Sequence, residues 1–222
     1  MAAVLEQDRT GEVPVGGAFL FNPVGASRIE TPELFTEEQR LYLKTGLQFS
    51  DEQVLPQSDK IEAKDNTLLR ELLRRAGELG LLMVDIPEAY GGLGLDKTTS
   101  LIIAESMSMQ GSWSVSFGAH TGIGTLPIVW FGTDAQKRKY LPRLATGELI
   151  AAYALTEQGS GSDALGARTK AVLSPDGKEW ILYGSKLYIT NAAFADVFVV
   201  FAKVDGDKFT GFIVERDRRA HV

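Results

Sequence analysis

The chain has 222 residues, of which 44% are hydrophobic and 23% charged, enough to bury one ordinary core or two small ones. Its net charge of −6 argues against a nucleic-acid partner, which would require a basic face. Cysteine is absent, which excludes disulfides and thiol nucleophiles, and the two histidines, His120 and His221, lie too far apart in the sequence to favour a metal site, so we expect none.

The first residues carry acidic side chains where a secretory signal would carry basic ones followed by an apolar run. No segment approaches the roughly 18 consecutive apolar residues that a membrane-spanning helix needs. Together with the absence of cysteine, these features predict a cytoplasmic protein.

The first two thirds of the chain show helical periodicity. Residues 1–35 are rich in glycine and proline and predict an extended arm. Thr36 and Gln39 form a capping box, so we expect a helix from there to Pro56, and a second from Asn66 to Gly80. Further helices are expected over residues 97–110, 114–130 and, after a Thr133 cap, 134–141, where Pro142 ends the last one.

From residue 149 onward the pattern changes to strands. Residues 168–174 and 179–183 flank a Pro-Asp-Gly-Lys turn typical of a hairpin. A short strand is expected at 187–190, a buried one at 197–204, and another at 209–215 after an Asp-Gly-Asp turn. The sequence therefore predicts an α+β fold: an all-α helical bundle domain, residues 36–148, followed by an incomplete antiparallel β-domain, residues 149–222.

The most informative stretch is residues 153–168, YALTEQGSGSDALGAR. Its Gly/Ser-rich turn, residues 159–162, would let backbone N–H groups and hydroxyls converge on a phosphate or pyrophosphate. An ordinary loop closed by Asp163 as a cap explains the same residues. The spacing alone leaves both interpretations open, because glycine-rich turns are common.

The segment ALTEQGSGSDALGA resembles the acyl-CoA dehydrogenase family pattern of a small residue, an aliphatic residue, Ser/Thr-Glu and, after a short gap, Gly-Ser-Asp. Three further blocks are similar to the family in order and spacing: VDIPEAYGGLGL, FGTDAQKRKYLPRLATGE and GSKLYITNAAFAD. The resemblance covers roughly residues 36–216. It implies the N-terminal part of a flavoprotein that uses FAD to oxidise fatty acyl-CoA to trans-2-enoyl-CoA in β-oxidation.

The resemblance also implies roles for seven residues, and family members often carry Trp at the position of Tyr188. A flavin that accepts hydride needs donors for the charge that builds on its pyrimidine side, and Thr156 would be one of them. Ser162 would lie close to both the pyrophosphate and the acyl-CoA, and Thr190 near flavin N5. The implied cofactor-binding residues are Tyr153, Leu155, Thr156, Gly161, Ser162, Tyr188 and Thr190.

Simpler interpretations exist for the same residues. Tyr188, Thr156 and Thr190 are also ordinary strand formers. Glu157 and Asp163 are expected to make turn hydrogen bonds rather than to transfer protons. His120 is expected to be a satisfied, partly buried histidine.

Small residues at Gly118, Ala119, Gly122 and Gly124 have two interpretations. One is close packing between helices, and the other is the floor of a deep acyl pocket. The N-terminal arm and the segments FGTDAQKRKYLP, SGSDA and FVVFAKV resemble the very-long-chain branch of the family most. A preference for long acyl chains is therefore our hypothesis.

Removal of the α-proton of the substrate needs a base, and the resemblance places it in a C-terminal helical domain that these residues do not contain. We therefore assign no catalytic residue and predict that the fragment alone binds FAD weakly and is inactive. The family also implies an electron-transferring flavoprotein as acceptor and a homo-oligomer, dimer or tetramer. The alternatives are a same-fold acyl-CoA oxidase or nitroalkane oxidase, or an inactive truncated interaction module.

Overall fold

The computed structural model describes residues 16–23 and 31–217. The chain divides into two compact units, Met1–Tyr42 and Leu43–Val222. The arm expected over residues 1–35 lies partly outside the described residues. Its described portion contains two short 3-10 turns, η2 (Ala18–Leu20) and η3 (Pro32–Leu34).

Helix α2 (Glu37–Phe49) begins with the expected capping box. The Gln39 N–H donates to Thr36 Oγ1 at 3.1 Å, and the Thr36 N–H donates to Gln39 Oε1 at 2.9 Å. Each side chain thus satisfies a backbone donor that the first turn leaves free. The helix was expected to continue to Pro56, but it passes into a π turn, η4 (Ser50–Val54), and a 3-10 turn, η5 (Leu55–Gln57), because proline has no N–H to continue the α pattern.

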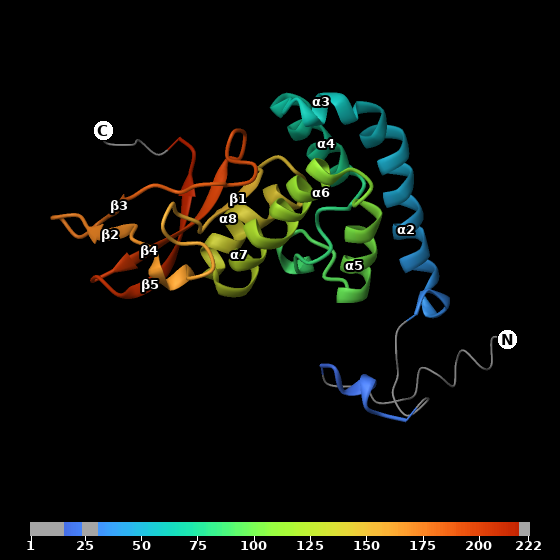
Figure 1. Ribbon diagram of the computed structural model, residues 1–222, viewed down its shortest axis with the longest axis horizontal. Coiled ribbons are helices and arrows are strands. Elements are labelled where there is room, and N and C mark those ends of the chain that lie inside the picture. The colour runs from blue at the N-terminus through green and yellow to red at the C-terminus, as the bar shows by residue number, and fades with distance from the viewer. Residues whose placement is uncertain (1–15, 24–30, 218–222) are drawn as a thin grey trace. The chain divides into compact units, whose positions relative to one another are not determined.

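Residues 43–217 of the second unit contain six further α-helices (Figure 1). Helix α4 matches its prediction: Asp65 caps it, its inner face buries Leu69, Leu72 and Leu73, and Gly80 leaves it at φ +79°. Every helix among residues 16–23 and 31–217 is too short or too polar to cross a bilayer. The helices are α3 (Ser58–Glu62), α4 (Asn66–Glu78), α5 (Lys97–Ser106), α6 (Gly111–Gly118), α7 (Leu126–Phe131) and α8 (Asp134–Ala145).

Two predicted helices differ from the structure. The continuous helix expected over 114–130 is divided into α6, a π-helical turn η7 (Ala119–Gly124) and α7. The Thr125 hydroxyl donates to the His120 carbonyl at 2.7 Å next to this turn, and Pro127 in the first turn of α7 has no N–H to donate back. Helix α8 was expected to end at Pro142 but continues to Ala145, because Leu144 and Ala145 are fully buried.

The five strands of the described part of the chain form one sheet around β4 (Val197–Val204). One edge of β4 pairs along its length with β5 (Lys208–Glu215), antiparallel. The other edge pairs first with β1 (Ala151–Ala154) and then with β2 (Lys170–Leu173), both parallel, and β3 (Trp180–Tyr183) adds to β2 as an antiparallel hairpin. The α+β class with a partial sheet is confirmed, but the sheet is mixed. Residues 184–196 return the chain to the end where β1 starts, so β4 runs in the direction of β1 and β2.

Two turns match the sequence and one predicted strand is absent. Gly177 has φ +71° in the β2–β3 hairpin, and Asp205 and Gly206 have φ +51° and +89° in the β4–β5 hairpin. The short strand expected at 187–190 is not formed. Tyr188 and Asn191 have φ +57° and +66°, outside the range that a strand allows.

Helices α7 and α8 pack against β1 and β4 through one buried cluster that includes Ile128, Leu141, Leu144, Ala151 and Val197 (Figure 1). A set of hydrogen bonds around Asp196 also joins the helices to the sheet. Arg70 donates to Asp196 Oδ2 at 2.8 Å and to the Phe194 carbonyl at 2.9 Å, and the same Oδ2 accepts the Ile150 N–H at 2.8 Å. Helix α4 is thereby tied to the residue that immediately precedes β1.

We expect Gly77→Ala to destabilise the chain by about 1–3 kcal/mol. Alanine normally favours a helix over glycine, but a Cβ at this position of α4 would lie 2.3 Å from the Thr146 carbonyl oxygen, which is backbone. The matched control is Gly118→Ala in α6, where a Cβ meets nothing within 4 Å, so stabilisation of up to about 1 kcal/mol is expected. Urea unfolding followed by circular dichroism measures both, and equal effects of the two substitutions would contradict the packing argument.

Candidate functional site

The two segments predicted to contact a flavin lie side by side. Strand β1 ends at Ala154, and the chain continues into the loop 155–169. The Leu187 N–H donates to the Thr156 carbonyl at 2.9 Å, and the Lys186 ammonium donates to the Leu155 carbonyl at 3.1 Å. These bonds place residues 188–190 next to residues 153–156 by a loop-to-loop contact rather than by strand pairing.

Glu157 holds this contact together. Its carboxylate accepts the Arg168 N–H at 2.6 Å, the Thr169 N–H at 3.0 Å and the Thr169 hydroxyl, and it pairs with Lys186 at 2.8 Å. Both members of the ion pair are 10% exposed. The carboxylate therefore closes the loop 155–169 and anchors the chain that leads to Tyr188, which is a structural role.

These contacts fix the protonation state of Glu157. Burial by itself raises the pKa of a carboxyl, but Lys186, the Thr169 hydroxyl and the two backbone N–H groups stabilise the charged form more strongly. Together they lower the pKa of Glu157 to about 2. The group is ionised at neutral pH, and all its contacts are with the chain itself.

The Gly/Ser-rich turn contains two kinds of residue. Ser160 is buried and its hydroxyl donates to the Asp163 carbonyl at 2.6 Å, while Asp163 Oδ1 accepts the Gly166 N–H at 3.1 Å. Gly161 and Ser162 are exposed, and a Cβ built on Gly161 meets nothing within 4 Å. The turn is thus braced by Ser160 and Asp163, and it leaves open backbone and a hydroxyl for an anion.

Tyr188 and Thr190 also present unused groups. Tyr188 is 86% exposed at a positive φ, which is uncommon for a bulky residue and typical of positions held in place by function. Among the residues that the structure describes, the hydroxyls of Thr156, Ser162 and Thr190 have no hydrogen-bond partner. Such hydroxyls suit the polar edge of a flavin and its diphosphate, so the donor chemistry of the site fits FAD.

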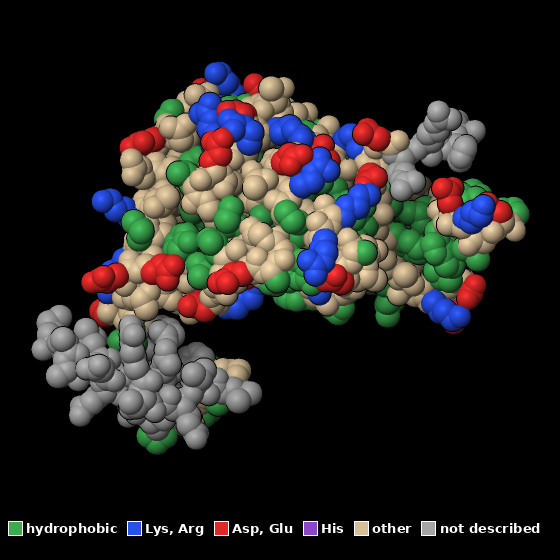
Figure 2. All heavy atoms as spheres, turned by 180° about the vertical axis from the view of Figure 1, so that it is seen from behind, with side chains coloured by type: hydrophobic (Ala, Val, Ile, Leu, Met, Phe, Trp, Pro, Cys, Tyr) green, Lys and Arg blue, Asp and Glu red, His purple; other side chains and the backbone are tan. Residues whose placement is uncertain are grey.

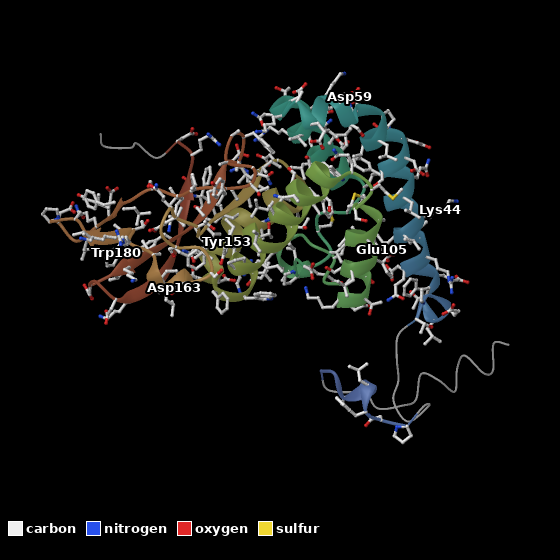
Figure 3. The ribbon with its side chains drawn as sticks, in the orientation of Figure 1. Lys44, Asp59, Glu105, Tyr153, Asp163 and Trp180 are labelled. Atoms are coloured by element: carbon white, nitrogen blue, oxygen red, sulfur yellow. The ribbon has the colours of Figure 1, made fainter. Side chains whose placement is uncertain are left out.

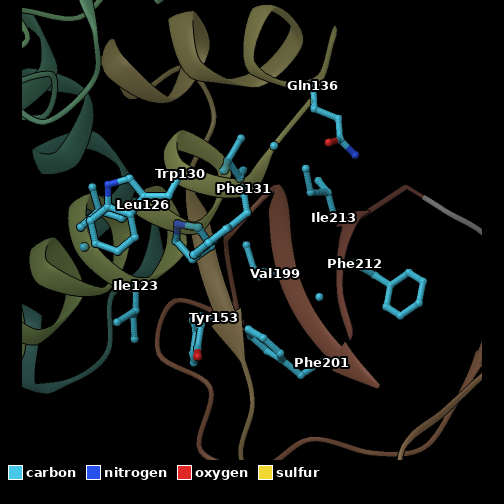
Figure 4. Close-up of a pocket in the computed structure, with 15 residues that line it drawn as sticks. Ile123, Leu126, Trp130, Phe131, Gln136, Tyr153, Val199, Phe201, Phe212 and Ile213 are labelled. Atoms are coloured by element: carbon cyan, nitrogen blue, oxygen red, sulfur yellow. The ribbon is translucent and has the colours of Figure 1, made fainter. Parts of the chain in front are cut away.

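A cavity of about 600 Å³ opens between η7 and α7 on one side and strands β1, β4 and β5 on the other (Figure 4). Tyr153 is the one predicted site residue in its lining, with its ring 5.0 Å from that of Phe201. Burial raises the pKa of the Tyr153 phenol, which stays neutral. The remaining lining is mostly apolar and includes Ile123, Leu126, Trp130, Phe131, Val199, Phe212 and Ile213.

Sequence reasoning did not single out Trp130 and Phe131, which are 58% and 83% exposed. The signal that could have found them is their adjacency. Successive residues of a helix point about 100° apart, so two neighbouring aromatics in a short helix cannot both enter the core.

A second hollow of about 490 Å³ lies between α6 and residues 189–194. Thr190 lines it, together with Val115 and Ser116 of α6. The seven predicted residues therefore do not line a single pocket. Tyr153 faces the apolar cavity, Thr190 faces the hollow beside α6, and Gly161 and Ser162 lie on the exposed turn between β1 and β2. Figure 3 shows Tyr153 where the helices meet the sheet and Asp163 on the adjoining loop.

The small-residue run contains one glycine that allows close packing and two glycines that face open space. A Cβ on Gly124 would lie 2.7 Å from Ala151 Cβ, so this glycine allows η7 to pack closely on β1. At Gly118 and Gly122 a Cβ would meet nothing within 4 Å. Ala119 is buried. Only the two open glycines can belong to the wall of a ligand pocket.

His120 is buried and fully bonded. Its Nδ1 accepts the Ala151 N–H at 3.0 Å, so Nε2 carries the proton and donates to the Leu144 carbonyl at 3.1 Å. Burial lowers the pKa of His120 to about 4, which keeps the ring neutral. The satisfied structural role matches the expectation from sequence, while His221 lies outside the described residues.

The described residues contain no group of three His, Asp or Glu side chains that could hold a metal ion. On the face shown in Figure 2, Lys and Arg side chains are interspersed with Asp and Glu, and hydrophobic side chains gather toward the sheet. The open apolar surface and the free hydroxyls, rather than a charged patch, distinguish the site.

Residues 36–148 match the family described as acyl-CoA dehydrogenase, N-terminal domain, and residues 152–221 match the acyl-CoA dehydrogenase middle domain. A probable acyl-CoA dehydrogenase of Bacillus subtilis is 56% identical over 209 residues, which are 94% of this chain and 35% of the relative. The human very long-chain specific acyl-CoA dehydrogenase, mitochondrial, is 40% identical over 83% of this chain and 30% of its own length.

Among solved structures, an acyl-CoA dehydrogenase from Bacillus anthracis complexed with FAD aligns with a TM-score of 0.88 and 52% identity. The alignment covers 92% of this chain and 35% of that chain. The chain thus spans about a third of the length of these relatives.

Removing the Glu157 charge should destabilise the loop contact. We expect Glu157→Gln to lower the free energy of unfolding at neutral pH by about 3 kcal/mol, because it leaves the Lys186 ammonium buried without its partner. Since the pKa of this carboxyl is lowered on folding, its contribution is present above the unfolded pKa and is lost as pH falls from about 4.5 toward 2. Unfolding curves at pH 7 and pH 3 should therefore show the difference between parent and variant shrinking.

The matched control is Glu148→Gln, which breaks the exposed pair with Arg143 and should cost less than about 1 kcal/mol. An effect of Glu157→Gln no larger than that of the control would contradict the assigned role.

Proposed function

Because the chain belongs to the acyl-CoA dehydrogenase family, we propose that its residues form the N-terminal part of an FAD-dependent enzyme that oxidises fatty acyl-CoA to trans-2-enoyl-CoA. The observation that carries the proposal is that the segment 188–190 lies next to the segment 153–156, while Thr156, Ser162 and Thr190 present hydroxyls with no hydrogen-bond partner among the described residues. Bound there, FAD would supply the acceptor for a hydride.

The residues of this chain would hold and orient that cofactor. Thr156 would donate to the pyrimidine edge of the ring, where negative charge develops on reduction. Thr190 and the exposed Tyr188 would flank the ring from the neighbouring segment. Gly161 and Ser162 would bind the diphosphate through the open turn, with Ser162 also near the acyl-CoA, and Tyr153 and Leu155 would line the ring edge.

The acyl chain would run along the outward face of α6 and η7. Val115, Gly118 and Gly122 recur on this face with helical spacing, and the two glycines leave space where other residues would fill it. An open wall of this kind favours long acyl chains. The long-chain preference is also supported by the human relative, whose name specifies very long chains.

The base that removes the α-proton would come from outside these residues. Glu157 lies close to the site, but its pKa of about 2 makes it a very weak base. We accordingly propose a helical domain over 36–148, a β-domain over 149–222 and a further C-terminal helical domain that carries a glutamate base. The 222 residues alone would then bind FAD weakly and be inactive. An electron-transferring flavoprotein as acceptor, a homo-oligomer, a cytoplasmic location and a role in fatty acid β-oxidation complete the proposal.

Anaerobic mixing of the full-length protein with acyl-CoA tests the proposal. We expect the purified protein to carry FAD and palmitoyl-CoA to bleach the visible flavin absorbance faster than butyryl-CoA does. Bleaching by neither thioester would contradict dehydrogenation. Faster reduction by butyryl-CoA would contradict the long-chain preference only, and rapid reoxidation by oxygen would indicate an oxidase.

We also expect Thr156→Val to slow flavin reduction by about 10²-fold, since removal of one positioned donor to a developing negative charge has that effect in other enzymes. Valine keeps the shape of the side chain and removes only the hydroxyl. Thr210→Val on β5, whose hydroxyl bonds the Lys208 carbonyl away from the site, is the matched control and should leave the rate unchanged. Equal rates for Thr156→Val and the parent would remove Thr156 from the site.

A further inference from the structure

A buried side-chain link joins α6 to the segment that follows Thr190. Ser116 and Asn191 are 2% and 7% exposed. The Ser116 hydroxyl donates to Asn191 Oδ1 at 2.6 Å, and Asn191 Nδ2 donates back to the Ser116 carbonyl at 2.9 Å. One asparagine amide therefore binds the hydroxyl and the carbonyl of a single helical residue, which fixes the distance and the orientation of Asn191 relative to α6.

The same amide reaches the start of the sheet. Asn191 Nδ2 lies 3.5 Å from the Ala151 carbonyl, and the Ala151 N–H donates to His120 Nδ1 at 3.0 Å. The first residue of β1 thus contacts, on its two backbone groups, side chains from two different elements. Tyr153 lies two residues farther along this strand.

The backbone of Asn191 makes this position hard to replace. It has φ +66°, a conformation that asparagine tolerates better than most residues. Its carbonyl accepts the N–H groups of Phe194 at 3.0 Å and Ala195 at 2.7 Å, which closes the turn after Thr190. Asn191 therefore combines a chain reversal with a side chain that points back to α6.

The hydrogen bonds between Ser116 and Asn191 connect the outward face of α6, which is proposed to contact the acyl chain, with the segment 188–190, which is proposed to contact the flavin. Val115, the neighbour of Ser116, lies on the outward face of α6, and Thr190 directly precedes Asn191, and both line the hollow beside α6. The distance between the wall for the acyl chain and the segment beside the flavin is consequently set by the Ser116–Asn191 pair.

We propose that Asn191 is a positioning residue that holds Thr190 and the start of β1 in register with α6, so that the acyl chain and the flavin meet at a fixed separation. The proposal rests on the proposed function for its ligands. Asn191 touches no reacting atom. Its effect would come through geometry, because a displacement of about 1 Å at a reacting centre can cost about 10²-fold in rate.

The test uses the full-length protein with Asn191→Gly. Glycine adopts φ +66° without strain, so the substitution removes the side chain and keeps the turn. Ser116→Ala removes the other half of the link. Asp205→Gly is the matched control, because Asp205 also has a positive φ, +51°, but lies exposed in the β4–β5 turn.

The first measurement is hydrogen–deuterium exchange without added flavin. Asn191→Gly should speed exchange at least tenfold in residues 111–118 and 187–194 together, Ser116→Ala should do so in the same two segments, and Asp205→Gly in neither. Unchanged exchange in either segment would overturn the link. A uniform increase over the whole chain would also overturn it, because that result indicates general destabilisation.

The second measurement is steady-state turnover of palmitoyl-CoA by protein loaded with FAD, together with the reduction potential of the bound flavin. Asn191→Gly should lower kcat about 10- to 100-fold, shift the potential, and change KM less than threefold, because misplacement acts on the reaction more than on binding. Parental kcat and potential in a variant with loosened segments would overturn the positioning role. If the parent turns over neither palmitoyl-CoA nor butyryl-CoA, the proposed function fails, and the exchange result still decides whether Asn191 joins the two segments.

Discussion

The start of β1 is the point on which the described structure depends. Asp196 accepts the Ile150 N–H, His120 accepts the Ala151 N–H, and Arg70 of α4 completes the joint by binding Asp196. Strand β1 pairs with β4 alone, so only one of its two edges gains hydrogen bonds from the sheet. Side chains from the helices and from the loop before β4 therefore fix where β1 begins. The position of Tyr153, which lies on this strand, depends on that starting point.

The ion pairs differ in how much they stabilise the fold, because some are buried and others are exposed to solvent. The Arg74 and Arg138 pairs lie on helix surfaces, where solvent screening leaves little net stabilisation. The Glu157–Lys186 pair is 10% exposed on both sides and is surrounded by backbone and hydroxyl donors. Losing either partner there would leave a desolvated charge, so this pair constrains the loop far more than its exposed counterparts constrain their helices.

Polar side chains that have hydrogen-bond partners within the chain differ in role from those that have none. Five polar side chains form hydrogen bonds within the chain itself: Glu157, Ser160, Asp163, His120 and Asn191. In contrast, the hydroxyls of Thr156, Ser162 and Thr190 have no hydrogen-bond partner among the described residues. Exposed apolar side chains gather nearby, around the cavity that Tyr153, Trp130 and Phe131 line. A bound cofactor and a thioester require hydroxyl donors that are free to bind them and an exposed apolar surface, both held in place by a rigid scaffold.

The sequence by itself determined the capping box at Thr36, the helix over 66–78, both hairpin turns, the strand 197–204 and the family, because these depend on local spacing and on short ordered motifs. It also predicted that Glu157 and His120 make hydrogen bonds within the chain, as both do. Only the tertiary structure decided that β4 lies between its partners in a mixed sheet, that residues 187–190 form no strand and Tyr188 takes a positive φ, and that the helix over 114–130 breaks at η7. Each of these outcomes depends on contacts between residues far apart in the chain. The link between Ser116 and Asn191, 75 positions apart, is of the same kind: no local pattern marks it, and it exists only because the folded chain brings the two side chains together.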